Sequence, residues 1–87
     1  MTRALAIELA PSAIRLNTVS PGHIDTPMIA SMLGHRQGRR AVIKSYPLRR
    51  VGTSADAAAL IHFLLSDRAS WITGVDYPLD GGRSIAG

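Results

Sequence analysis

The spacing of apolar residues predicts a helix at the start of the chain, over residues 1–10. The stretch TRALAIELA consists of strong helix formers, and Leu5 and Leu9 lie four residues apart on one face. Pro11 predicts the end of the helix, because proline cannot continue its hydrogen bonds. No capping residue precedes Thr2, so we expect the chain to begin inside a helix rather than at its first turn.

A second and clearer helix is predicted over residues 53–66. Thr53 and Asp56 have the spacing of a capping box, in which each side chain satisfies a backbone N–H at the helix start. Apolar residues then follow at positions i, i+3, i+4 and i+7, namely Ala57, Leu60, Ile61 and Leu64. We therefore expect one apolar face that packs against the rest of the domain.

Two short segments have the composition of strands. Residues 14–20 (IRLNTVS) are rich in β-branched and apolar side chains and are stopped by Pro21. In residues 75–79 the apolar positions alternate, and the run Asp-Gly-Gly that follows predicts a turn. Strand, helix and strand joined by a long crossover predict two parallel neighbours connected in the right-handed sense.

The segment between the first strand and the second helix, residues 23–50, is predicted to be a long irregular connection. Short helices are expected within it, around residues 27–33 and 39–45, with Pro47 as a break near its end. Long connections inside a compact domain are usually functional and often form a lid over a ligand. We expect this segment to act as such a lid.

Parallel sheets normally contain several strands and have both faces covered. Two strands with two or three helices make an incomplete version of that α/β architecture, because the first strand has no partner on its other side. We therefore expect the chain to represent part of a longer domain. A chain with such an unpaired strand edge is also expected to self-associate or to unfold in part.

The composition limits the chain to one small domain. It has 87 residues, 46% of them hydrophobic and 18% charged, and it contains no cysteine. Disulfides and cysteine-ligated metals are thereby excluded, and the three histidines have no metal-binding spacing, so no metal site is expected. The longest apolar run, residues 57–65, is interrupted by His62 and is too short to span a membrane. A cytoplasmic location fits the lack of cysteine.

The net charge of +4 is concentrated in one window. The basic side chains there are Arg36, Arg39, Arg40, Lys44, Arg49 and Arg50, with no acid between Asp25 and Asp56. One interpretation is a surface for nucleic acid or an anionic substrate, as in a small basic binding or interaction module. The other, which we favour, is a solvated segment whose charge keeps it soluble. Nucleic acid is therefore not expected as a partner.

The most informative stretch is NTVSPGHIDTPM, residues 17–28. Ligands of open parallel sheets lie beyond the carboxyl ends of the strands, and Pro21 and Gly22 lie at such an end. Glycine lets a flat ring approach the backbone closely, Ile24 can offer its main-chain N–H and C=O to an amide, and Thr26 adds a hydroxyl. These groups suit a carboxamide with a nearby phosphate. An ordinary strand-ending turn with a hydroxyl cap on the next helix explains the stretch equally well.

Two long runs resemble the classical short-chain dehydrogenase/reductase family. The run RALAIELAPSAIRLNTVSPGHIDTPM is similar to the stretch that follows the family's catalytic helix, and PLRRVGTSADAAALIHFLLSDRASWITGVDYPLDGG is similar to its C-terminal end. Together they cover nearly the whole chain, in order. The resemblance implies the C-terminal part of a Rossmann-type doubly wound parallel sheet. In it, residues 1–10 end the catalytic helix and residues 75–79 form the last strand.

The resemblance also implies a cofactor site and a substrate lid. Pro21, Gly22, Ile24 and Thr26 would contact the nicotinamide end of NAD or NADP. Residues 23–50 would form the lid, in which three apolar side chains, Met28, Met32 and Leu33, would line the substrate. These three side chains could equally be the buried face of a lid helix.

By the same resemblance, the whole enzyme would be an oxidoreductase acting on an alcohol or ketone and would form homo-oligomers, in this family often homotetramers. The family's catalytic serine, tyrosine and lysine would precede Thr2. Tyr46 and Arg50 have a similar spacing to the tyrosine–lysine pair, but Pro47 disfavours a helix there, and arginine does not tune a phenol as lysine does. We therefore assign no catalytic residue and expect the 87 residues to be inactive alone.

Overall fold

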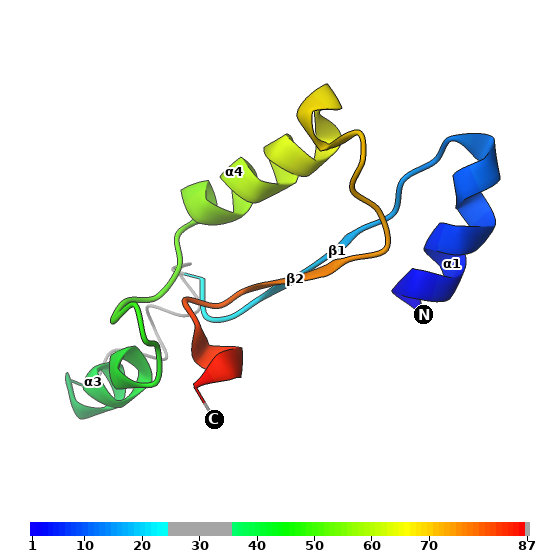
Figure 1. Ribbon diagram of the computed structural model, residues 1–87. Coiled ribbons are helices and arrows are strands. Elements are labelled where there is room, and N and C mark those ends of the chain that lie inside the picture. Colours follow the sequence, from blue (N-terminus) through cyan, green and yellow to red (C-terminus); the bar gives the residue numbers. More distant parts are fainter. Residues whose placement is uncertain (25–35, 87) are drawn as a thin grey trace.

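The computed structural model describes residues 1–24 and 36–86. Two short strands run side by side through the middle, with one helix on either side of the pair (Figure 1). The helices are α1 (Thr2–Leu9), α3 (Arg36–Lys44) and α4 (Ser54–Leu65), and the strands are β1 (Thr18–Pro21) and β2 (Asp76–Leu79). Single 3₁₀ turns occupy Ala10–Ser12, Asp67–Ala69 and Arg83–Ile85.

The two strands are parallel neighbours, as predicted, and Thr18 pairs with Asp76 at the start of the register. β1 begins four residues later than the predicted strand over residues 14–20. The reason is the Asn17 side chain, which donates to the Ile72 carbonyl at 3.0 Å and accepts from the Val75 N–H at 3.1 Å. Because the Asn17 side chain binds the Ile72 carbonyl and the Val75 N–H, regular backbone hydrogen bonding between the strands begins only at Thr18.

Helix α1 is held against the strands by small residues and one hydroxyl pair. Ala6 is buried, and a β-carbon placed on Gly74 would lie 3.4 Å from its side chain. The hydroxyls of Thr2 and Thr18 are hydrogen-bonded at 2.7 Å. The helix ends before Pro11, as predicted, and the chain continues into the turn Ala10–Ser12.

Helix α4 begins with the predicted capping box. The Thr53 hydroxyl accepts from the Asp56 N–H at 3.1 Å, and the Asp56 carboxylate accepts from the Thr53 N–H at 2.8 Å. At the other end of the helix, the Arg15 guanidinium donates to the Leu64 carbonyl at 2.9 Å and to the Ile72 carbonyl at 3.3 Å. One cation therefore satisfies a carbonyl of the last helical turn and fastens α4 to the segment that leads into β1.

The connection between β1 and α4 is more regular than predicted near its end. α3 begins at Arg36, three residues before the predicted helix over residues 39–45. Gly38 lies inside this helix, with open space around the position of its missing side chain. The predicted helix over residues 27–33 lies outside the described residues.

The buried core of the residues whose burial the structure describes, 1–24 and 38–86, is small. The buried apolar residues are Ala6, Tyr46, Leu64 and Ala69, whereas Ile7, Leu65 and Trp71 are 75%, 79% and 98% exposed. Within residues 1–24 and 36–86, β1 pairs only with β2, so the predicted unpaired strand edge is present there. None of the helices in these two ranges has the length and apolar character needed to cross a bilayer.

We expect Thr53→Ala to lower the free energy of unfolding by about 1 kcal/mol, because the substitution removes the side-chain acceptor at the start of α4. Urea unfolding followed by circular dichroism measures the change. Ser54→Ala is the matched control, since Ser54 is an exposed hydroxyl residue one position further on. Equal stability of Thr53→Ala and the control would contradict the role of the cap.

Candidate functional site

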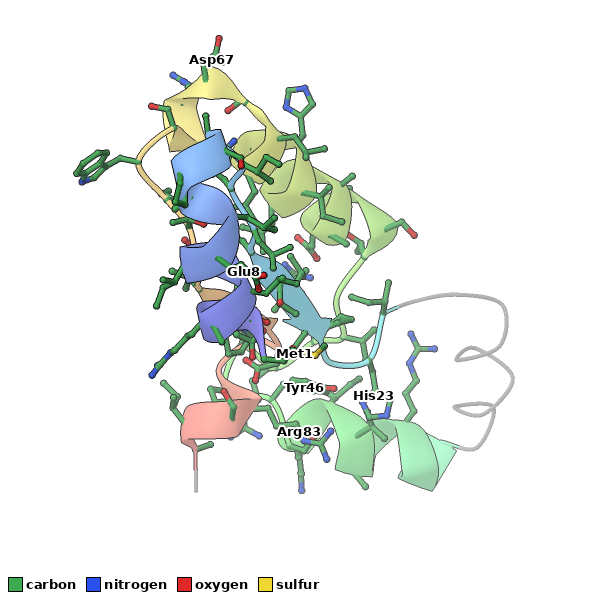
Figure 2. The ribbon with its side chains drawn as sticks, turned by 90° about the vertical axis from the view of Figure 1, so that its right-hand side faces the viewer. Met1, Glu8, His23, Tyr46, Asp67 and Arg83 are labelled. Carbon is green, nitrogen blue, oxygen red and sulfur yellow. The ribbon has the colours of Figure 1, made fainter. Side chains whose placement is uncertain are left out.

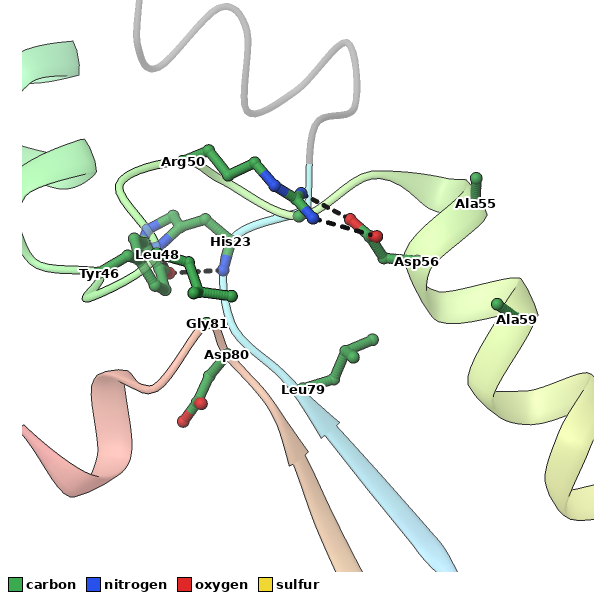
Figure 3. Close-up of a pocket in the computed structure, with 11 residues that line it drawn as sticks. His23, Tyr46, Leu48, Arg50, Ala55, Asp56, Ala59, Leu79, Asp80 and Gly81 are labelled. Carbon is green, nitrogen blue, oxygen red and sulfur yellow. Dashed lines mark hydrogen bonds and ion pairs between the residues drawn. The ribbon is translucent and has the colours of Figure 1, made fainter.

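The carboxyl ends of β1 and β2 meet at one edge of the sheet, and a third segment crosses them there (Figure 3). β1 runs into the turn that contains Gly22 and His23, and β2 runs into the turn that contains Asp80 and Gly81. We call the crossing segment, residues 45–52, the strap. It connects the end of α3 to the start of α4.

Backbone hydrogen bonds attach the strap to both strand ends. The Leu48 N–H donates to the Gly81 carbonyl at 3.1 Å, and the Gly52 N–H donates to the His23 carbonyl at 2.8 Å. Within the strap, the Arg49 N–H closes a turn onto the Tyr46 carbonyl at 2.8 Å. The strap therefore holds the two turns at fixed positions relative to each other.

Tyr46 lies at the centre of this junction and is only 1% exposed. Its hydroxyl accepts from the His23 backbone N–H at 2.7 Å and is also hydrogen-bonded to the His23 ring nitrogen Nδ1. A β-carbon on Gly22 would lie 2.9 Å from the same hydroxyl, a distance too short for a real contact. Tyr46 therefore fills the space beside Gly22. If the glycine served only to let a ligand approach the backbone, that space would be open to solvent.

The turn after β2 packs on the other side of the tyrosine. Gly81 and Gly82 have φ values of 57° and 90°, which only glycine adopts readily. The Arg83 guanidinium lies 5.5 Å from the centre of the Tyr46 ring, within the range of a cation–π contact. Figure 2 places Tyr46, His23 and Arg83 together at this end of the strands.

Asp80 closes the same turn with its carboxylate. Its oxygens accept from the backbone N–H of Gly82 at 3.1 Å and of Ser84 at 3.0 Å. Hydrogen bonding by Ser84, first through its side chain and then through its backbone, holds the pKa of Asp80 below its usual value. The carboxylate therefore stays charged and orders the turn rather than acting as a proton donor at neutral pH.

A cavity of about 360 Å³ lies between the strap, the end of β2 and the start of α4. Its polar lining comes from His23, Tyr46, Arg50, Asp56 and Asp80, and its apolar lining includes Leu48 and Leu79 (Figure 3). The volume falls in the range of small-molecule sites, which are mostly apolar with a few polar groups.

Arg50 and Asp56 form an ion pair in the wall of this cavity. Two guanidinium nitrogens contact the two carboxylate oxygens at 2.7 and 3.2 Å. The hydrogen bond from Arg50 and those from Thr53 hold the pKa of Asp56 well below its usual range, and the pKa of Arg50 is raised in turn. The pair links the strap to the first turn of α4.

The predicted cofactor residues are only partly described. Pro21, Gly22 and Ile24 lie at the carboxyl edge of the sheet, where Ile24 pairs with Gly52 as an isolated bridge. Their contact with a nicotinamide stays a prediction. The other predicted site residues, Thr26, Met28, Met32 and Leu33, lie outside the described residues.

Tyr46 is the residue whose importance the sequence did not reveal. The sequence offers Tyr46 and Arg50 only by their spacing, which is that of a catalytic pair, and Pro47 argues against that role. The structure gives each a separate partner, His23 for the tyrosine and Asp56 for the arginine. The one signal in the sequence is that Tyr46, a large aromatic residue, lies between the basic helix and Pro47. Such a residue is unusual in a solvated segment.

The basic window does not form an ion-pair network. Arg39, Arg40 and Lys44 are exposed on α3, and the only ion pair found in residues 1–24 and 38–86 is that of Arg50 with Asp56. The exposed positions agree with the interpretation of a solvated segment. The same two ranges contain no cluster of histidine and acidic side chains that could hold a metal ion.

Comparison with known proteins gives consistent results. A family model described as enoyl-(acyl carrier protein) reductase matches residues 1–84. A cyclohexanol dehydrogenase of an Acinetobacter species is 41% identical over 81 residues, which are 93% of this chain and 30% of that protein.

Solved structures agree with this match. A short-chain type dehydrogenase/reductase from Mycobacterium ulcerans superposes with a TM-score of 0.89 at 34% identity, over 97% of this chain and 30% of its own. YwfH, an NADPH-dependent reductase involved in bacilysin biosynthesis, superposes with a TM-score of 0.86 at 32% identity, over 94% of this chain and 34% of its own. The chain thus spans about a third of the length of the proteins it matches.

The ion pair predicts a pH dependence of stability. Because the pKa of Asp56 is lower in the folded chain than its ordinary value of 3.8, its contribution is fully present above about pH 5 and is lost as the pH falls through and below 4. Urea midpoints measured between about pH 6 and pH 2 should fall less steeply for Asp56→Asn than for the parent chain. Asp67→Asn, which removes an exposed carboxylate elsewhere, should follow the parent, and equal curves for all three would contradict the assignment.

The contact between Gly22 and Tyr46 predicts a packing cost. We expect Gly22→Ala to lower the free energy of unfolding by roughly 1–3 kcal/mol, because the new methyl group has to displace the buried tyrosine. Gly38→Ala, whose added β-carbon would have no atom within 4 Å beyond its own helix turn and chain neighbours, should be neutral or slightly stabilising. Thermal or urea unfolding of both variants measures the difference, and a neutral Gly22→Ala would show that the two residues are not in contact in solution.

Proposed function

The chain belongs to the short-chain dehydrogenase/reductase family, and from that premise we propose that it supplies the nicotinamide shelf, the substrate lid and a subunit contact of an oxidoreductase. The enzyme would use NAD or NADP and act on an alcohol or ketone. The observation that carries the proposal is the position of the turn with Pro21, Gly22 and Ile24. It lies at the carboxyl end of β1, beside the equivalent end of β2, where open parallel sheets bind their ligands.

The backbone of Ile24 suits a carboxamide. Among the described residues, no hydrogen bond uses its N–H or its C=O, because the neighbouring Gly52 bonds to the carbonyl of His23 instead. One donor and one acceptor on the same residue match the amide of a nicotinamide. When bound, NAD or NADP would supply the hydride or accept it, and the shelf would hold the ring in place. That YwfH is described as NADPH-dependent supports a nicotinamide cofactor here.

The cavity beside the strap supports a small-molecule substrate. Its apolar wall, with Leu48 and Leu79, suits a hydrocarbon skeleton, and His23 and Tyr46 offer polar groups at one side. A relative whose name gives cyclohexanol as its substrate fits that chemical class. Met28, Met32 and Leu33 would complete the lid. The chain carries no residue to which we assign proton transfer.

The exposed apolar surface supports a subunit contact. Leu65 at the end of α4 and Trp71 just beyond it are 79% and 98% exposed. In the full enzyme the homo-oligomer would be a homotetramer. Burial of two such side chains between its subunits would stabilise the assembly by a few kcal/mol, at roughly 25 cal/mol per Å² of apolar surface. We propose a cytoplasmic location for the enzyme, with which the lack of cysteine in these 87 residues is in keeping.

The test is a chimera in which this chain replaces the matching 81-residue segment of the Acinetobacter cyclohexanol dehydrogenase. We expect the chimera to oxidise cyclohexanol with a nicotinamide cofactor, whereas residues 1–87 alone show no turnover. Ile24→Pro in the chimera removes the N–H and should raise the KM for the cofactor roughly tenfold, the value of one good hydrogen bond. Ile24→Val keeps the N–H and is the matched control.

Three results would contradict the proposal. The first is a folded chimera of normal secondary structure that binds no cofactor. The second is equal cofactor KM values for Ile24→Pro and Ile24→Val. The third is turnover by the 87 residues alone that disappears when a residue of this chain is replaced.

A further inference from the structure

His23 is held by the strap through three polar groups at once. Its backbone N–H donates to the Tyr46 hydroxyl at 2.7 Å, its carbonyl accepts from the Gly52 N–H at 2.8 Å, and its ring nitrogen Nδ1 is bonded to the same hydroxyl. No other residue in the described ranges has its backbone and side chain both tied to a single tyrosine. This arrangement limits where the protons can lie.

The backbone N–H can only donate, so it uses a lone pair of the tyrosine oxygen. Among the described residues, Nδ1 is the only acceptor within hydrogen-bond distance of the hydroxyl, so we take the hydroxyl as the donor of this second bond and Nδ1 as its acceptor. A neutral imidazole carries one proton, so the proton of His23 is on Nε2. Among the described residues no hydrogen bond uses Nε2, and His23 lines the cavity of about 360 Å³.

We propose that Tyr46 is the positioning residue of the nicotinamide shelf, and that it fixes His23 as an Nε2–H donor for an oxygen of the ligand. The inference rests on the proposed function, and it assigns a role to two residues that the family resemblance left without one. The ligand group that fits is a neutral acceptor, such as a carbonyl or hydroxyl oxygen. Tyr46 acts through His23 and the turn, not by touching reacting atoms.

The surroundings of Tyr46 suit this role. The ring is buried, fills the space beside Gly22 and lies under the Arg83 guanidinium. Charged groups that line the same cavity are already engaged, Arg50 with Asp56, and Asp80 with backbone N–H groups of its own turn. Among the described residues, Nε2 of His23 has no hydrogen-bond partner, whereas the Arg50 guanidinium already donates three hydrogen bonds to Val51 and Asp56.

The variant Tyr46→Phe distinguishes a positioning role of Tyr46 from a role in packing alone. The substitution keeps the ring, its contact with Gly22 and the cation–π contact, and it removes only the hydroxyl. Tyr77→Phe is the matched control, because Tyr77 is a half-buried tyrosine on β2 whose hydroxyl has no hydrogen bond among the described residues. Both variants are compared with the intact 87-residue chain, labelled with ¹⁵N.

The first measurement is the tautomer of His23, from long-range proton–nitrogen correlations. We expect protonated Nε2 and unprotonated Nδ1 in the parent chain and in Tyr77→Phe, and a mixture of tautomers in Tyr46→Phe. The His23 backbone amide should exchange with solvent roughly three- to tenfold faster in Tyr46→Phe, in line with the loss of one hydrogen bond. The same tautomer and the same exchange rate in Tyr46→Phe as in the parent chain would overturn the proposal.

The second measurement is a titration with nicotinamide mononucleotide at millimolar concentration. In the parent chain the amide signals of His23 and Ile24 should shift, and Tyr46→Phe should need several-fold more ligand for the same shift. If the parent chain does not respond, the positioning role fails, whereas the proposed function is decided separately by the chimera. If parent and Tyr46→Phe respond equally, the positioning role fails alone.

Discussion

The structure depends on how the ends of two parallel strands are held together. Parallel neighbours cannot be joined by a hairpin, so the backbone beyond their carboxyl ends needs another support. Here that support is the strap, whose Tyr46 hydroxyl binds the turn after β1 and whose Leu48 N–H binds the turn after β2. The turn that we propose as the nicotinamide shelf is positioned by these contacts.

Side-chain clamps supply much of the order that a large core supplies in bigger domains. Few of the described residues are fully buried, so apolar burial among them alone gives limited stability. Asn17 binds the start of the sheet, Arg15 binds the end of α4, and Asp56 binds both the strap and the helix N-terminus. Each of these side chains joins two segments of the chain through hydrogen bonds.

The sequence predicted the elements that arise from local patterns. The capping box of Thr53 and Asp56, the end of the first helix at Pro11 and the parallel strand pair follow from spacing and residue type, and all three are present. The late start of β1 could not be predicted, because it depends on Asn17 reaching a segment more than 50 residues further along the chain. The roles of Tyr46 and of Gly22 depend likewise on a contact between distant segments.

Glycine at position 22 shows how one pattern can have two physical causes. From the sequence, its lack of a side chain suggested close approach of a flat ligand ring, and in the structure the space beside it is occupied by a protein ring. The two causes are compatible, since a turn fixed on one side by Tyr46 can present its other groups to a ligand. The packing of Tyr46 is therefore sufficient to explain why position 22 is glycine, and a role in binding would be an additional one.

The central claim is that Tyr46 contacts both strand ends at once. Nuclear Overhauser effects from its ring protons in the intact chain test this most directly. The account predicts effects to the α-protons of both Gly22 and Gly81, in the same sample as cross-strand effects between β1 and β2. Cross-strand effects without either contact to Tyr46 would mean that the strands pair without the strap, and would contradict the account.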